Sequence, residues 1–71
     1  MVTVDARGLS CPEPVLRARR AMEKLQPGEL LEVLVETETA RENVSRAAGS
    51  MGCEVMVTES EQGYVLSIRR P

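Results

Sequence analysis

The chain has 71 residues, a hydrophobic content of 42%, a formal net charge of −2 and a single aromatic residue, Tyr64. This length and composition predict one domain over residues 1–71, with a core of aliphatic side chains. The acidic balance and the shortage of aromatic residues argue against direct nucleic-acid binding, and the lack of a long apolar run argues against a membrane span.

The two cysteines, Cys11 and Cys53, are far apart in the sequence, and the chain has no histidine. Because a zinc site needs about four thiolate or imidazole ligands, we expect no metal, and no other cofactor is indicated. Asp5 and Arg7 come too early for a signal peptide, so we expect a cytoplasmic protein. Cytosolic thiols are normally reduced, which makes a Cys11–Cys53 disulfide the less favoured alternative.

The first half of the chain changes from a strand pattern to a helix pattern. Alternation over residues 1–5 predicts a strand, and residues 6–10 predict a loop. After Pro12, apolar residues recur every three or four positions, as on one face of a helix that Pro27-Gly28 ends. The residues of that face are Val15, Ala18, Met22 and Leu25.

The second half predicts a strand, a helix and a hairpin. Residues 30–36 alternate as a strand, Thr37 or Thr39 can cap the next helix, and Gly52 can end it. Two further strands are expected over residues 53–58 and 64–69, joined by a polar turn over residues 60–63. The expected inward-facing residues are Leu31, Val33, Val35, Ala40, Val44, Ala47, Met51, Cys53, Val55, Val57, Tyr64, Leu66 and Ile68.

The order strand–helix–strand–helix–strand–strand predicts a two-layer α/β (α+β) sandwich. Strand–helix–strand units favour parallel crossovers, and the last two strands favour an antiparallel hairpin, which together make a mixed four-stranded sheet. Both helices would then cover one face of the sheet and leave the other open. The residues that could make that open face apolar are Leu30, Leu34, Met56 and Val65.

Cys11 is the residue that most strongly indicates chemistry. It precedes a proline at the expected start of a helix, where free amides and the positive end of the helix dipole favour a thiolate. Pro12 and Pro14 stiffen the turn, and Glu13 adds a negative charge that Arg7 and Arg17 can offset. A thiolate there could attack a sulfane sulfur and carry it as a persulfide. The alternative is that Cys11 is only a small, half-buried residue before a helix.

The residues missing from the sequence also restrict the chemistry. Without histidine there is no Cys–His pair for thiol-protease catalysis, and no second cysteine follows Cys11 after two intervening residues, as a thioredoxin-like pair requires. One nucleophile without an acid/base partner suits a group carrier better than a turnover enzyme with its own substrate pocket. Cys53 is interpreted as a buried core residue, with a resolving thiol for Cys11 as the alternative.

Residues 5–14 resemble the start of the TusA/SirA-like family of sulfur carriers. The matching positions are Asp5, Gly8, Leu9, Cys11, Pro12, Glu13 and Pro14, and the turn at residues 26–29 is similar as well. The resemblance implies the sandwich fold, with Cys11 as the sulfur-bearing residue. It also implies a donor protein of the cysteine desulfurase or rhodanese type, and an acceptor protein in tRNA thiolation, molybdenum cofactor synthesis or sulfur oxidation.

One region departs from the tRNA-thiolation branch of that family. Residues 36–44 contain no proline, whereas that branch typically has prolines there. This stretch and residues 45–55 look more like the N-terminal domain of YedF-type proteins, which are linked to selenium metabolism.

Three hypotheses follow for the function. In the first, Cys11 carries a persulfide, Asp5, Gly8, Pro12 and Pro14 shape the loop, and a charged set tunes the site or meets partners: Arg7, Glu13 and Arg17. In the second, the protein is a non-catalytic binding or regulatory module that uses the open sheet face. In the third, the same cysteine handles selenium.

Overall fold

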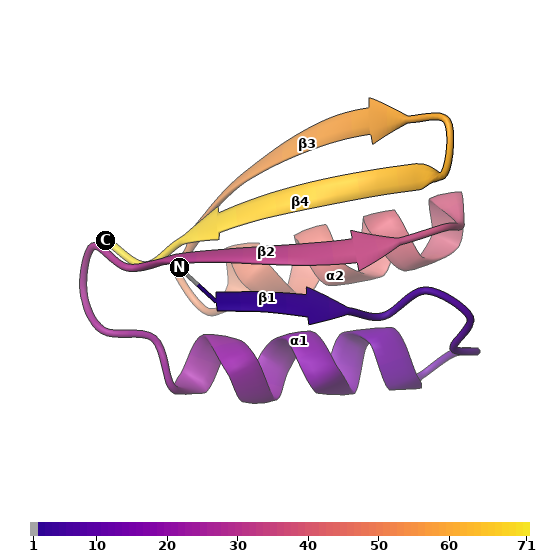
Figure 1. The fold of residues 1–71 in the computed structure, drawn as a ribbon. Coiled ribbons are helices and arrows are strands. Elements are labelled where there is room, and N and C mark those ends of the chain that lie inside the picture. Colours follow the sequence, from indigo (N-terminus) through magenta and orange to yellow (C-terminus); the bar gives the residue numbers. More distant parts are fainter. Residues whose placement is uncertain (1) are drawn as a thin grey trace.

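The computed structural model describes residues 2–71 as a mixed four-stranded sheet covered on one face by two helices (Figure 1). The elements, in chain order, are β1 (Val2–Asp5), α1 (Glu13–Glu23), β2 (Leu30–Val35), α2 (Glu38–Ser50), β3 (Glu54–Ser60) and β4 (Gly63–Arg69). The predicted sandwich and element order are therefore confirmed. Met1, included in the first predicted strand, lies outside the described residues.

The strand order across the sheet is β1-β2-β4-β3. β1 runs parallel to β2, while β4 is antiparallel to both β2 and β3. β2 and β3 therefore point the same way, but β4 lies between them. Because β2 and β4 are the central strands, their inward side chains are the most deeply buried.

α2 has the ends that its sequence predicts, whereas α1 ends at Glu23, so Leu25 lies just beyond the helix and not on its apolar face as predicted. The Thr37 hydroxyl accepts a hydrogen bond from the Ala40 amide at 3.1 Å, so Thr37 rather than Thr39 caps α2. At the other end Gly52 has a φ of +76°, and the Cys53 amide donates to the Ala48 carbonyl at 2.9 Å. This is the Schellman arrangement, in which a left-handed residue ends the helix and turns the chain toward β3.

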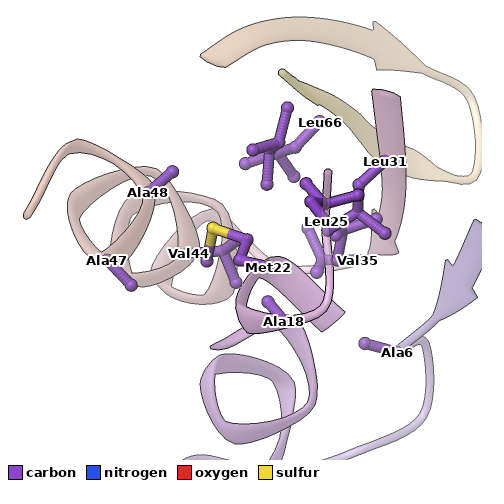
Figure 2. Close-up of a cluster of buried hydrophobic side chains, with 12 residues drawn as sticks. Ala6, Ala18, Met22, Leu25, Leu31, Val35, Val44, Ala47, Ala48 and Leu66 are labelled. Carbon is purple, nitrogen blue, oxygen red and sulfur yellow. The ribbon is translucent and has the colours of Figure 1, made fainter. Parts of the chain in front are cut away.

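The core lies between the sheet and the helices (Figure 2). Ala18 and Met22 of α1, with Val44 of α2, are almost completely inaccessible to solvent. They pack against the inward faces of the central strands, made by Leu31, Val33, Val35, Leu66 and Ile68. The core contains no aromatic ring, so its volume is filled by aliphatic side chains and one methionine.

The core differs from the prediction at the edge strand β3. Val57 shares the inward face with Leu66, yet 38% of it is exposed, and Val55 and Cys53 are only half-buried. The strand also extends through Ser60, so the turn is shorter than predicted. An edge strand has a neighbour on one side only, which leaves its inward side chains partly open to solvent.

The open face of the sheet carries the four apolar residues predicted for it, but they do not form a continuous patch. Leu34 pairs with Val65, and Met56, 71% exposed, is opposite Ser67. Leu30 is opposite Arg69, which pairs with Glu54 at 3.1 Å, and Glu32 lies between Leu30 and Leu34 along β2. Within residues 2–71, neither helix is long and apolar enough to cross a membrane.

Candidate functional site

Cys11 is an exposed free thiol on the loop that joins β1 to α1. Two hollows border it. One is a small pocket of about 140 Å³ between this loop and the start of α2, and the other is a groove of about 440 Å³ between the two helices. Cys11 and Pro12 line both hollows, and the peptide bond between them is cis. A reagent could therefore approach the sulfur from either side.

The start of α1 offers fewer free amides than the sequence suggested. Pro12 is the N-cap and makes no side-chain capping bond, and Pro14, in the first turn, has no N–H. The Glu13 amide donates to the Ser10 carbonyl at 2.9 Å. Among residues 12–15, only Val15 has an amide with no recorded acceptor. The α1 dipole still points its positive end toward Cys11.

The start of α2 lies beside the same thiol. Thr37, Thr39 and Ala40 from this end of α2 line the small pocket together with Cys11. Figure 1 shows that α1 and α2 begin at the same end of the molecule. Cys11 is thus flanked by the N-terminal ends of two helices, and both dipoles favour negative charge there.

Asp5 and Arg7 form a bidentate pair at the base of the Cys11 loop. The Arg7 Nε and Nη2 atoms donate to the two Asp5 carboxylate oxygens, each at 2.9 Å, and the Arg7 amide donates to Oδ1 at 3.1 Å. The third guanidinium nitrogen, Nη1, donates to Gln62 Oε1 at 3.1 Å, in the β3–β4 turn. These bonds tie the loop to the hairpin at the opposite edge of the sheet.

The Asp5–Arg7 pair predicts an unusually low pKa for the Asp5 carboxyl group. The hydrogen bonds from Arg7 lower the pKa of Asp5 from 3.8 to about 2, and the same bonds raise the pKa of Arg7. A lowered carboxyl pKa stabilises the fold above the unfolded pKa, and this contribution is lost as the pH falls toward 2. In a ¹³C NMR titration we expect the Asp5 carboxyl midpoint near 2 and a return toward 3.8 in Arg7→Gln. An unchanged midpoint in that variant would show that Arg7 is not the cause.

Glu36 holds the same loop from the end of β2. Its carboxylate accepts a hydrogen bond from the Gly8 amide, and Gly8 has a φ of +79°, which favours glycine. The Ala6 amide also donates to the Leu34 carbonyl at 2.9 Å. The loop that carries Cys11 is therefore fixed at three points before it reaches the thiol.

We expect Glu36→Ala to loosen the loop without unfolding the protein. The exposed hydrogen bond contributes about 1 kcal/mol, so the free energy of unfolding should fall by no more than that. Hydrogen exchange of the Gly8 amide should speed up by about fivefold, since its acceptor is gone. Glu38→Ala is the control, because Glu38 pairs only with Arg41. Equal exchange at Gly8 in both variants would remove Glu36 from this role.

The structure separates the predicted charged residues into two groups. Glu13 pairs with Arg17 one turn later, at 3.5 Å, so its charge is offset as expected. Arg7 instead faces Asp5 and Gln62, and it forms no ion pair with Glu13 among the described residues. Pro14 is buried under the loop, whereas Pro12 is exposed beside the thiol.

Cys53 lies away from Cys11. It follows the C-terminal end of α2, half-buried against the core, whereas Cys11 borders the N-terminal half of that helix. A helix of 13 residues is ~20 Å long, which places the two free thiols beyond direct reach of one another. The geometry thus gives Cys53 no part in the site.

Sequence reasoning missed three residues around the site: Gln62, Glu36 and Arg46. Gln62 is 55 positions from Arg7, and Glu36 is 28 positions from Gly8. Arg46 faces the groove from α2. No local pattern indicates contacts at such separations. The similarity of the 5–14 segment to a known family was the only available signal for the loop as a whole.

Three comparisons agree on the family. The sequence profile described as "Sulfurtransferase TusA" matches residues 2–70. The sulfur carrier protein TusA of Pseudomonas paraeruginosa is 34% identical over 68 residues, covering 94% of this chain and 86% of that protein. A relative from Archaeoglobus fulgidus, whose sulfur-carrier name is provisional, is 39% identical over 66 residues, covering 93% of this chain and 86% of its own.

A solved structure gives the same result for the fold. The crystal structure of a SirA-like protein from Desulfitobacterium hafniense superposes with a TM-score of 0.83 at 34% identity, covering 97% of this chain and 95% of that one. Sequence and structure agree along almost the whole chain. This protein belongs to the TusA sulfurtransferase family.

Proposed function

We propose that this protein is a sulfur carrier that holds sulfane sulfur as a persulfide on Cys11 and relays it to an acceptor protein. The observation that carries the proposal is the position of Cys11, an exposed thiol at the N-terminal ends of two helices in a chain of the TusA family. A donor of the cysteine desulfurase or rhodanese type would supply the sulfur. The carrier would then act in the cytoplasm without a cofactor.

The chemistry consists of two thiol exchanges. In loading, the Cys11 thiolate attacks the outer sulfur of a donor persulfide, a new S–S bond forms, and the donor leaves as a thiolate. In delivery, an acceptor thiolate attacks the outer sulfur of Cys11 persulfide, and Cys11 leaves as a thiolate. Each step breaks one S–S bond and forms another, so the relay needs no added oxidant or reductant.

The site supports these steps through charge and access. Thiolate and persulfide are both anions, and helix N-termini stabilise anions. Cys11 is exposed, so large donor and acceptor proteins can reach it. No side chain of the described site is placed to act as a general base, which suits transfer between groups that are already ionised.

The relay is tested in two stages. The reduced protein is incubated with a cysteine desulfurase and cysteine, separated from both, and then offered a thiol-containing acceptor protein. Intact mass spectra should show one sulfur atom added after the first stage and lost after the second. A protein that gains sulfur but never yields it to a thiol would be a sulfur sink, and the relay would be wrong.

A further inference from the structure

The groove between the two helices joins Cys11 to a pair of arginines. Val15 and Arg19 of α1, with the N-cap residue Pro12, line one side of it, and Arg46 and Ser50 of α2 line the other. It is a shallow groove of about 440 Å³ that is largely open to solvent. Arg19 is seven residues beyond Pro12, so the arginine end of the groove is ~10 Å along α1 from the thiol end.

The charge of this groove is unbalanced. None of the residues that line it is acidic, although acidic residues outnumber basic ones by 11 to 9 in the whole chain. Within residues 2–71 neither Arg19 nor Arg46 forms an ion pair, so both leave an uncompensated charge beside the groove. Arg20, Lys24 and Arg70 also form no ion pair among these residues, but they lie outside the groove. Two like charges along one groove repel, and an anion between them would remove that cost.

We propose that this groove binds a low-molecular-weight thiol persulfide that carries a carboxylate, with its sulfur end at Cys11 and its carboxylate end between Arg19 and Arg46. A bare ion held by the arginines would not also touch Cys11, given the separation along α1. A molecule the length of a short peptide spans both ends. This inference rests on the proposed function, because it names a small-molecule sulfur donor for the same cysteine.

The transfer step balances without a further reagent. The Cys11 thiolate attacks the outer sulfur of the bound persulfide, the S–S bond of the ligand breaks, and the ligand leaves as a thiolate. The arginines act only as binding residues: they hold the carboxylate and do not touch the reacting sulfur atoms. The arginines should therefore speed the loading of Cys11 by a donor that bears a carboxylate, and should not speed loading by a donor that lacks one.

The test compares two donors that differ in their carboxylates. Glutathione persulfide and the persulfide of glutathione diethyl ester are reacted with the wild type and with the double variant Arg19→Gln/Arg46→Gln. Persulfide formed on Cys11 is followed by mass spectrometry against time. Arg20→Gln is the matched control, because Arg20 is on the same helix but outside the groove. Circular dichroism verifies that each variant folds.

We expect the double variant to react about tenfold more slowly than the wild type with glutathione persulfide at low ionic strength, and the difference to shrink with added salt. The diethyl ester should not react more slowly with the double variant, and Arg20→Gln should match the wild type with both donors.

Equal loss of rate with both donors, or no loss with either, would overturn the carboxylate site while leaving Cys11 as the carrier. Loss only in transfer to a protein thiol would assign the groove to a protein segment instead. If neither donor loads the wild type, the carrier function itself fails.

Discussion

Cys11→Ser should abolish sulfur loading and leave the fold intact. A hydroxyl cannot form a persulfide, so no sulfur should be gained from any donor. Cys11 is exposed and makes no core contact, so the free energy of unfolding should change by less than about 0.5 kcal/mol. Loading is measured by intact mass after incubation with a desulfurase and cysteine, and stability by urea unfolding.

The matched variant is Cys53→Ser. Cys53 packs half-buried against the core, and the substitution puts a hydroxyl among apolar groups, so it should cost about 1 kcal/mol and keep full loading. The two variants should therefore have opposite effects. Cys11→Ser should lose sulfur loading and keep its stability, and Cys53→Ser should lose stability and keep its sulfur loading. Sulfur retained by Cys11→Ser but lost by Cys53→Ser would reverse the assignment of the two thiols. Unchanged partner binding and phenotype in Cys11→Ser would favour a binding module.

Gly63→Ala should be the most destabilising single methyl addition among the glycines at positive φ. Gly63 begins β4 with a φ of +128°, and a Cβ there would collide with the Val35 carbonyl oxygen and lie 2.7 Å from the Glu36 Cα. Both neighbours are backbone atoms that cannot rotate away. We expect a loss of about 3 kcal/mol, from strain and overpacking together, measured by urea unfolding. A domain of this size has roughly 4 to 10 kcal/mol in total.

Gly28→Ala separates the two causes of that loss. Gly28 also has a positive φ, +85°, but no atom lies within 4 Å of the position its Cβ would take. It should cost only the backbone strain, about 1 kcal/mol. If the two variants lose equal stability, the close approach of Gly63 to the end of β2 contributes nothing. In Gly63→Ala we also expect faster exchange of the Gly8 amide, because Glu36 is displaced.

The local elements could be predicted because their patterns depend on neighbouring residues. The alternation in β2, the helical spacing in α1 and the cap at Thr37 are all short-range features, and each is present in the structure. The position of β4 between β2 and β3 depends on pairing across more than thirty residues, as in Leu31 with Ile68. Strand order therefore needed the structure, and so did the partial exposure of Val57.

The site likewise combines features that the sequence could predict with features that depend on distant residues. The position of Cys11 before a helix was evident from its proline neighbours, and the family resemblance supported its role. The hydrogen bonds that fix its loop come from Glu36 and Gln62, at the end of β2 and in the hairpin turn. The two prolines that mark the helix start also remove amides from it, so α2 supplies part of the positive environment expected from α1.

Peptide-level mass spectrometry of the wild type tests the central claim most directly. The reduced protein is incubated with a cysteine desulfurase and cysteine, its remaining thiols are alkylated, and it is digested. We predict one added sulfur on the peptide containing Cys11, removable by reductant, and none on the peptide containing Cys53. Failure to add sulfur with several donors, while Cys11 is freely alkylated, would contradict the carrier function.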